Sequence, residues 1–191
     1  MFAEPNETIR DYLLVSILTG ARRSNVLSMC WKDVDLKQRI WKLCETKNDE
    51  PQTIPLVSLA VEILTCRKDN GSDFVFHSAA SKSGHLEEIK SGWKRVLKRA
   101  GITDLRLHDL RRTFGSWQAL TGTSLHIIGK SLNHKSYAAT QVYARLNIDP
   151  IRESVERATD SLFKAAGLAI ENNLLPFPAA PKQENDRKGN L

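Results

Sequence analysis

The residues best suited to chemistry lie in one stretch of the sequence. His108 and Arg111 are three positions apart and are followed by His134 and Tyr143. Residues three apart share one face of a helix, and a guanidinium offers a planar fork of donors that suits a phosphate. A histidine can exchange a proton near neutral pH, and a tyrosine hydroxyl can act as a covalent nucleophile. Together these groups suggest phosphoryl transfer through a phosphotyrosine.

Five short motifs, in a fixed order, surround these residues and extend upstream of them. They are Thr19-Gly-Ala-Arg22-Arg-Ser-Asn25, Thr46-Lys47 with Thr53-Ile-Pro-Leu56, His108-Asp-Leu-Arg111-Arg-Thr-Phe, Leu132-Asn-His134-Lys-Ser and Thr140-Gln-Val-Tyr143-Ala. The set resembles the tyrosine recombinase family, also called phage integrases. The resemblance covers roughly residues 8 to 165. Any one motif alone is weak, but the order and spacing of all of them are specific.

The resemblance implies catalytic roles for six residues: Arg22, Lys47, His108, Arg111, His134 and Tyr143. The two arginines would clamp the phosphate oxygens, where positive charge is needed because a phosphodiester repels nucleophiles. The second histidine would hydrogen-bond the phosphate, and the first would help proton transfer. The lysine, at the tip of a hairpin, would protonate the leaving 5′-oxygen. Arginine charge near the tyrosine is expected to favour its phenolate.

Two positions depart from the family pattern, and several simpler readings compete with it. Asn25 stands where the family usually has Glu, and Asn133 replaces a common Gly, although Asn tolerates the left-handed conformation better than most residues. The neighbouring arginines, Arg23 and Arg112, could be ordinary surface residues. Two histidines near a carboxylate could also hold a metal, but their spacing of 26 residues without Cys or acidic partners in register argues against it. We therefore expect neither a metal nor a cofactor.

The composition bounds the class of protein. The chain has 191 residues, 41% of them hydrophobic, which suits a globular domain of ordinary size. No apolar run approaches the roughly 20 residues that span a bilayer, and the N-terminus lacks the features of a secretory signal. Three cysteines without Cys-x-x-Cys spacing predict buried, reduced thiols. These features predict a cytoplasmic protein, associated with the nucleoid when it is bound to DNA.

The positive charge is concentrated just before the second arginine motif. The net charge is +6, and the stretch from Lys90 to Arg112 holds eight Lys or Arg against two Asp. A solvated helix face would explain such a strip equally well if it stood alone. Placed beside a motif that handles phosphate, it predicts contact with a DNA backbone. The expected DNA-binding residues are Lys90, Lys94, Arg95, Lys98, Arg99 and Arg112.

The hydrophobic pattern predicts a mainly α protein with a small antiparallel sheet, the fold that the family resemblance also implies. Caps and periodicity predict a helix after Asn6 that ends at Gly20, helices after Ser24, Ser58, Ser124 and Ser136, and helices over Leu86–Ala100 and Leu107–Leu120. Strands are expected at Trp31–Val34, Ile40–Glu45 and Gln52–Leu56, with a brief extended piece at Phe74–Phe76.

The C-terminal part is expected to comprise one further helix and a tail. Asp149 and Pro150 place an N-cap before a helix that runs to Gly167. Its apolar stripe of Ile151, Val155, Ala158 and Leu162 could pack on its own domain or, as the family resemblance implies, dock onto a neighbouring protomer. Beyond it, Asn, Pro and Lys predominate, which predicts disorder. The expected domains are therefore a catalytic domain over 1–167 and a disordered tail over 168–191.

These observations predict the catalytic domain of a site-specific DNA recombinase, of the prophage integrase type. It would cleave and rejoin strands by transesterification through a 3′-phosphotyrosine. The alternatives are a DNA-relaxing enzyme that resembles a type IB topoisomerase and a truncated, non-catalytic DNA-binding remnant. Its partner would be double-stranded DNA, with a homotetramer on DNA for the full-length protein and a monomer for the isolated chain.

Overall fold

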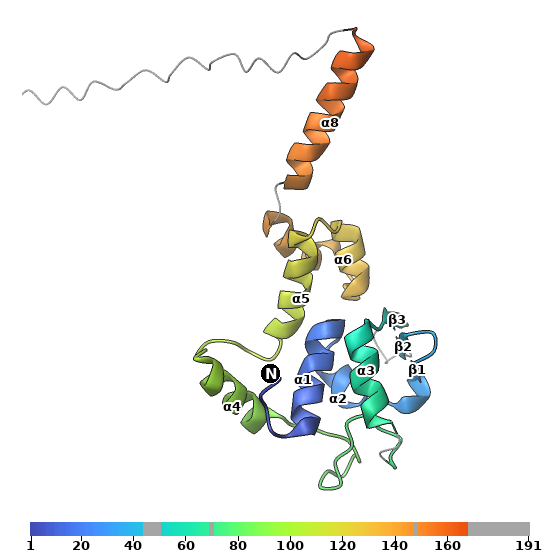
Figure 1. The fold of residues 1–191 in the computed structure, drawn as a ribbon, viewed down its shortest axis with the longest axis vertical. Helices are drawn as coiled ribbons and strands as arrows, with labels where there is room; N and C mark the ends of the chain where they lie inside the picture. Colours follow the sequence, from blue (N-terminus) through green and yellow to red (C-terminus); the bar gives the residue numbers. More distant parts are fainter. Residues whose placement is uncertain (44–50, 69–70, 147–148, 168–191) are drawn as a thin grey trace, which may run out of the picture. The chain divides into compact units, whose positions relative to one another are not determined.

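The computed structural model describes residues 1–43, 51–68, 71–146 and 149–167 (Figure 1). It comprises two compact units, Met1–Ile148 and Asp149–Leu191, which are described separately. The expected fold class is confirmed: the described part is mainly helical with one small antiparallel sheet. Its elements are α1 (Glu7–Thr19), α2 (Arg23–Leu27), η1 (Trp31–Asp33), β1 (Val34–Asp35), β2 (Ile40–Leu43), β3 (Gln52–Pro55), α3 (Ser58–Arg67), α4 (Lys90–Ala100), α5 (Asp109–Leu120), α6 (Leu125–Ser131), α7 (Tyr137–Thr140), η2 (Gln141–Leu146) and α8 (Asp149–Ala165).

Helix α1 begins and ends where its sequence predicts. The Asn6 side chain accepts a hydrogen bond from the backbone N–H of Ile9 at 3.0 Å, which satisfies one of the free donors of the first turn. Gly20 ends the helix with a φ of +61°. A Cβ atom at this position would overlap Cδ1 of Phe114, so the turn also needs Gly for the close approach of α5.

The sheet has the strand order β1-β2-β3, with both neighbouring pairs antiparallel. Trp41 on β2 pairs with Ile54 on β3, and both side chains are buried in the core. The strand expected at Trp31–Val34 is wrong for its first three residues, which form the 3-10 helix η1. The cause is local: the N–H of Asp33 bonds the carbonyl of Cys30, which closes a helical turn in place of a strand ladder.

Helix α4 begins at Lys90, later than the predicted Leu86. The Glu88 carboxylate accepts the N–H groups of Ile89 and Lys90 at 3.0 and 3.1 Å and thereby starts the helix there. Upstream, the N–H of Leu86 donates to the carbonyl of Phe76 at 2.7 Å, so this backbone is already engaged in a tertiary pairing. The helix ends at Gly101, with a φ of +67°, as predicted.

Among the remaining predicted helix caps and buried cysteines, some are confirmed and others are wrong. Ser124 and Ser136 cap α6 and α7 as predicted. Ser24 does not cap α2, because the helix already includes it and begins at Arg23. The cysteines were expected to be buried, but Cys66 is exposed and Cys30 is half-buried, whereas Cys44 lies outside the described residues.

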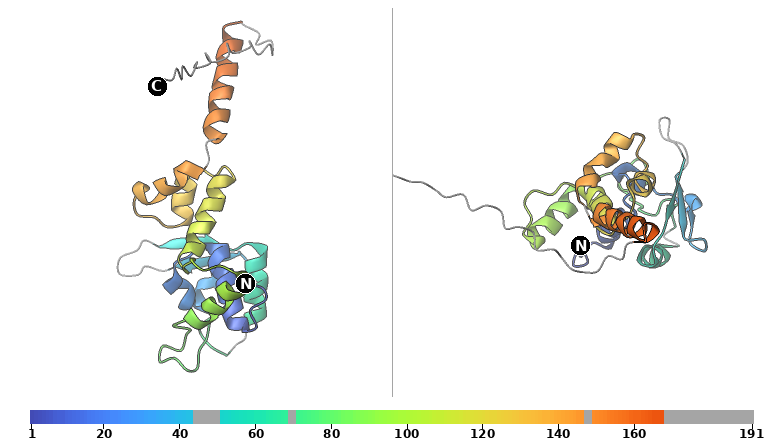
Figure 2. Two further views of the ribbon diagram at one scale, coloured as in Figure 1. Left: turned by 90° about the vertical axis from the view of Figure 1, so that its left-hand side faces the viewer. Right: turned by 90° about the horizontal axis from the view of Figure 1, so that it is seen from above.

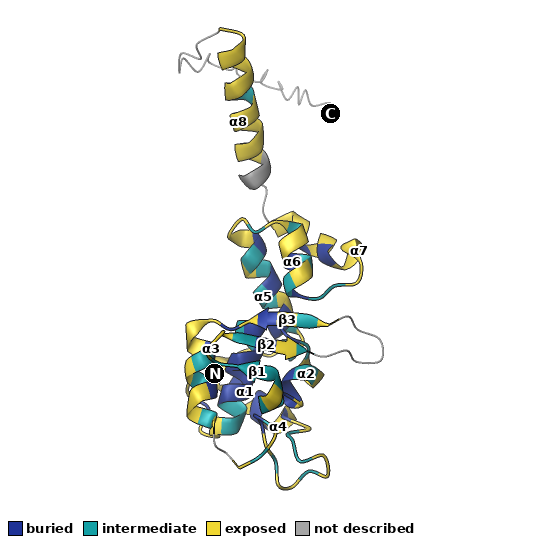
Figure 3. Ribbon diagram, turned by 90° about the vertical axis from the view of Figure 1, so that its right-hand side faces the viewer, coloured by how far each residue is buried: buried dark blue, intermediate teal, exposed yellow. Residues whose placement is uncertain are grey.

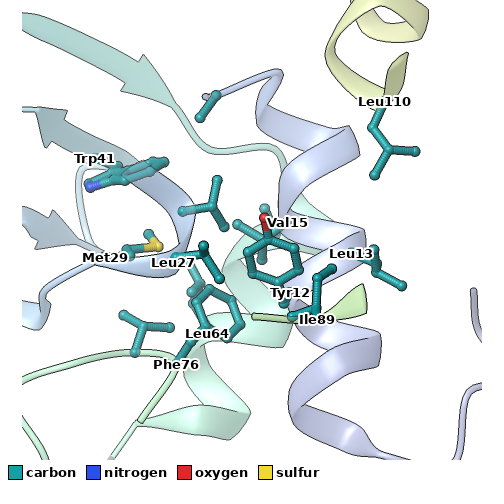
Figure 4. Packing of buried hydrophobic residues seen from close by; sticks show 14 of the residues in the cluster. Tyr12, Leu13, Val15, Leu27, Met29, Trp41, Leu64, Phe76, Ile89 and Leu110 are labelled. Atoms are coloured by element: carbon teal, nitrogen blue, oxygen red, sulfur yellow. The ribbon is translucent and has the colours of Figure 1, made fainter. Parts of the chain in front are cut away.

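Two clusters of buried side chains hold the first unit together. The larger one joins α1, α3, α4 and the sheet, with Tyr12, Phe76 and Trp41 among its largest members (Figure 4). The smaller one consists of Ala119, Ile128, Leu132 and Tyr143, from α5, α6 and η2. Helix α5 connects the two, because Leu110 near its start belongs to the larger cluster and Ala119 near its end to the smaller one (Figures 2 and 3).

The second unit contains α8. It spans 17 residues and ends at Ala165, just before Gly167 with a φ of +70°. Val155, Ala158 and Leu162 recur at helical spacing on it, as predicted, and Val155 and Leu162 are exposed within their unit. The side chain of Asp149 and the tail predicted for 168–191 lie outside the described residues. Throughout the described part, no helix is both long enough and apolar enough to cross a membrane.

Candidate active site

A cavity of about 650 Å³ lies between α5, η2 and the segment that joins α6 to α7. Four of the six residues to which the sequence assigns catalysis line it: His108, Arg111, His134 and Tyr143. The structure therefore brings together side chains that are up to 35 positions apart in the sequence (143 − 108). Arg22 adjoins this group through the backbone of Asn133, and Lys47 lies outside the described residues.

Arg111 is the most firmly held of the polar groups. It lies on the first turns of α5, and only 7% of it is exposed. Its Nη1 donates to the carbonyl of Gly20 at 2.6 Å, and its Nη2 donates to the carbonyl of Leu132. Since both acceptors are backbone oxygens of well-defined turns, the plane of the guanidinium is fixed before any ligand arrives.

Arg22 reaches the same region from another part of the chain. It is the N-cap residue of α2, and its Nη2 donates to the carbonyl of Asn133 at 3.0 Å. The two arginines are thus bound to the carbonyls of consecutive residues, 132 and 133. Asn133 itself has a φ of +48°, a left-handed conformation that Asn tolerates better than most residues.

Tyr143 lies in η2, where only 4% of it is exposed. Its ring is nearly parallel to that of His134, at 9° with 6.4 Å between the centroids. A Cβ atom on Gly115 of α5 would lie 2.7 Å from Tyr143 Cζ, so the ring fits only because this residue is Gly.

The burial of Tyr143 has an electrostatic consequence. Desolvation raises the pKa of its hydroxyl, and the charges of Arg111 and Arg112 only partly offset this effect. Arginine charge therefore lowers the pKa of Tyr143, in the expected direction. The effect of burial is larger, so the net shift is upward. The hydroxyl is a protonated phenol near neutral pH, and its proton must leave when the oxygen attacks.

His134 and His108 both have a lowered pKa. Desolvation is the main cause for each, and the next is the positive charge of Arg111. Nδ1 of His134 lies 2.9 Å from Oγ1 of the buried Thr140, which orients the ring. Both imidazoles are therefore neutral at pH 7, so each can accept a proton or keep one N–H as a donor.

These shifts predict that the unit loses stability in mild acid. Because the pKa in the folded state is below the unfolded value of 6.5, the unfolded chain binds the protons first as the pH falls through that value. The melting temperature of the wild type is expected to fall between about pH 7 and pH 5, and that of His134→Gln to fall less. The same change at the exposed His126 is the control. Equal pH slopes for the wild type and His134→Gln would contradict the prediction.

The predicted DNA-binding strip lies mostly apart from this cavity. Arg112 lines it, but the five strip residues on α4 do not. Arg95 and Arg99 instead pair with Glu4, at 2.5 and 3.8 Å. Only 1% of Glu4 is exposed, and the hydrogen bond from Arg95 lowers the pKa of its carboxyl group. The single charge of Glu4 is therefore shared between two of the five cations on α4, and the role of the strip stays a prediction.

Sequence reasoning missed the residues that support the site. Gly115 makes room for the tyrosine, and Thr140 orients His134. Gln52 on β3 donates to the carbonyl of Ser131. Ser116 and Arg145 line the cavity. Thr140 could have been suspected, because it lies within a quoted motif. The others gave no signal, because their effect depends on contacts between distant segments. Within the described part, no group of three His, Cys, Asp or Glu side chains is placed to hold a metal ion.

Comparison with known proteins places this site in context. A model described as the phage integrase family matches residues 2–149. The prophage integrase IntF of Escherichia coli is 33% identical over 176 residues, which are 88% of this chain and 37% of that protein. The tyrosine recombinase XerA of Pyrococcus furiosus is 31% identical over 163 residues, 81% of this chain and 56% of that protein. The chain thus spans between about a third and just over half of these relatives.

Solved structures show the same fold. The catalytic domain of bacteriophage HP1 integrase matches with a TM-score of 0.57 at 20% identity, covering 76% of this chain and 79% of that one. XerH recombinase bound to a palindromic difH substrate, in a post-cleavage complex, matches with a TM-score of 0.63 at 19% identity. In that comparison, 81% of this chain and 47% of the other are covered.

Proposed function

This chain belongs to the phage integrase family of tyrosine recombinases, and on that basis we propose that it carries the catalytic part of a site-specific DNA recombinase. The observation that carries the proposal is the cavity in which Arg111, His134 and Tyr143 meet, with Arg22 beside them. A buried phenol, two guanidinium groups and two neutral imidazoles provide a nucleophile, a charge clamp and proton carriers. We propose double-stranded DNA as its substrate, and the structurally similar Tn1549 transposon integrase was solved in complex with circular intermediate DNA.

The proposed reaction is a transesterification in which atoms and charge balance. The Tyr143 oxygen attacks the phosphorus, and its proton passes to a neighbouring base, for which His108 is the candidate. A bond forms between the tyrosine oxygen and phosphorus, and the bond from phosphorus to the 5′-oxygen breaks. That oxygen takes up a proton, from Lys47 by family resemblance, and leaves as a 5′-hydroxyl. A 5′-hydroxyl from a second strand reverses the step, so religation needs no ATP.

A trapping assay tests this proposal. A DNA duplex with a nick near the cleavage site loses a short 3′ fragment after attack, so the covalent complex accumulates. The wild type is expected to form an adduct that survives denaturant and is removed by protease. Because the arginines supply the charge, the adduct should also form in excess chelator. If no duplex yields an adduct, the chain is a DNA-binding remnant and not an enzyme.

Gly115→Ala tests whether the space at Gly115 positions the ring of the proposed nucleophile, Tyr143. The new methyl group would lie 2.7 Å from Tyr143 Cζ and 2.9 Å from Leu132 Cδ1, so the ring must move. Adduct formation is expected to slow by roughly 10- to 100-fold, since displacements of about 1 Å have effects of that size. The matched control is Gly92→Ala on α4. Its methyl group would lie 2.6 Å from the side chain of Ile9 on α1, so it overpacks the fold without touching the tyrosine. Equal rates for the two variants would contradict the prediction.

We further propose that the isolated chain is a monomer and that the full-length protein assembles as a tetramer on DNA. The exposed apolar stripe of α8 supports a docking role for that helix, as in the family. Few aliphatic side chains bury too little area for a stable interface without DNA.

Truncation after Ile148 tests this assembly role. Because the first unit ends there, its melting temperature should change by less than about 2 °C. Assembly on DNA should weaken, as measured by sedimentation with and without duplex. Unfolding of the truncated chain would instead place α8 in the domain core.

Relaxation of supercoiled DNA by the wild type without any strand exchange would favour the topoisomerase-like alternative.

A further inference from the structure

The C-terminal turn of α6 is bonded by side chains from three separate parts of the chain. We call residues 130–133 the carbonyl turn. Nε2 of Gln52 donates to the carbonyl of Ser131 at 2.8 Å and lies 3.5 Å from that of Lys130. The next two carbonyls, of Leu132 and Asn133, accept from Arg111 and Arg22. Four consecutive backbone oxygens are therefore approached by donors from β3, α5 and the start of α2.

The physical reason is the end of a helix. The last carbonyls of an α-helix have no partner within the helix and carry partial negative charge, so they attract donors and cations. The amide of Gln52 must direct its nitrogen toward them, because a side-chain oxygen could not bond to a carbonyl oxygen. The three donor side chains thus bond to different carbonyls of one short stretch of backbone.

The carbonyl turn has reason to need this support. It ends at Asn133, whose φ of +48° is costly for any residue with a Cβ atom. His134 follows directly, and its N–H bonds to the carbonyl of Gly129 at 2.9 Å. A shift of this turn would move the acceptors of both arginines and the backbone of the histidine together.

Gln52 is well placed to prevent such a shift. Its backbone is fixed in the ladder between β3 and β2, opposite Leu43, and its side chain is half-buried. Residues 52 and 131 are 79 positions apart, so the bond joins the sheet to the small cluster that holds Tyr143. Its neighbour Thr53 is exposed, as the alternation along a strand requires.

We infer that Gln52 is a positioning residue of the phosphate clamp. It anchors the carbonyl turn to the sheet, and the carbonyl turn thereby orients Arg111 and Arg22. The catalytic consequence rests on the proposed function, but the anchoring of the turn does not.

Three substitutions separate positioning from general stability. Gln52→Glu keeps the shape, removes the donor and adds charge against two carbonyls. Gln52→Leu removes all polarity, and Gln52→Lys keeps a donor that can reach Ser131. The matched controls are Gln38→Glu and Gln38→Lys, which make the same charge changes at an exposed turn of the same sheet, between β1 and β2.

Single-turnover cleavage of the nicked duplex and DNA affinity are measured for each variant. Gln52→Glu and Gln52→Leu are expected to cleave roughly 10- to 100-fold more slowly. Their DNA affinities should stay within about threefold of those of the matched charge controls, because the phosphate-contacting groups remain present. Gln52→Lys should restore cleavage to within about threefold of Gln38→Lys. Wild-type rates for Gln52→Glu, or equal losses for all three variants together with a lower melting temperature, would overturn the inference.

Amide hydrogen exchange provides a readout that is independent of catalysis. Exchange at the N–H groups of Asn133 and His134, which bond the carbonyls of Lys130 and Gly129, should be about tenfold faster in Gln52→Glu than in Gln38→Glu. Unchanged exchange overturns the inference even if the enzyme is active. Faster exchange in a chain that never forms an adduct would sink the proposed function and leave the anchoring role intact.

Discussion

Tyr143→Phe is expected to abolish covalent attachment to DNA while leaving DNA affinity within about twofold of the wild type. The ring packs against Gly115 and Leu132, and Phe retains all of these ring contacts. Only the oxygen that would attack the phosphorus is lost. The rate of adduct formation should therefore fall by about 10³-fold or more, to the limit of detection.

The matched control for this change is Tyr137→Phe. Tyr137 is 65% exposed and does not line the catalytic cavity, so its hydroxyl should be dispensable for cleavage. Adducts can be counted by gel electrophoresis in denaturant, and peptide mapping can locate the modified residue. An adduct of undiminished yield in Tyr143→Phe would assign the nucleophile to another side chain and would remove the main support for the proposed mechanism.

Arg111→Lys is expected to show the second-largest loss. Arg111 satisfies the carbonyls of Gly20 and Leu132 at the same time and is buried while doing so. A lysine ammonium is a point charge without the planar fork and cannot bond both oxygens while facing a phosphate. Cleavage should fall by about 10²- to 10³-fold, as when one donor to a developing charge is removed.

The same substitution should also lower the melting temperature. A buried carbonyl left without a donor costs about 1–3 kcal/mol, and each kcal/mol shifts the midpoint of a chain of this size by about 2–4 °C. Arg39→Lys is the control, because Arg39 is exposed between β1 and β2 and does not line the cavity. If Arg111→Lys cleaves as fast as Arg39→Lys, the two carbonyl contacts do not aim a catalytic group.

The proposed catalytic side chains that meet in the cavity were predictable because their chemistry is carried by residue type and spacing. His134 and Tyr143 are nine positions apart, and each is recognisable within a short motif. The limits of α1 were predictable for the same reason, since Asn6 and Gly20 signal a helix start and end locally. What is local in sequence could be inferred without the structure.

The supports of the site were not predictable, because they depend on residues that are far apart. The pairing of Glu4 with Arg95 spans 91 positions, and it makes a residue of the presumed DNA-binding strip the partner of a buried carboxylate. The start of α4 depended on whether the N–H of Leu86 was already engaged, which only the tertiary fold decides. The net rise in the pKa of Tyr143 likewise follows from burial, which the motif does not encode.

The carbonyl turn also bears on how such a site can change over evolutionary time. Its acceptors are backbone oxygens, which every amino acid carries, so mutations at Lys130, Ser131 or Leu132 replace side chains without deleting an acceptor. Position 132 is restricted to side chains that fill the buried cluster, and position 133 to residues that tolerate a positive φ, such as Asn or Gly. The arrangement of Arg22 and Arg111 can thus be retained while side chains of the carbonyl turn change by genetic drift. Lineages can also exchange Gly for Asn at position 133 and keep this arrangement.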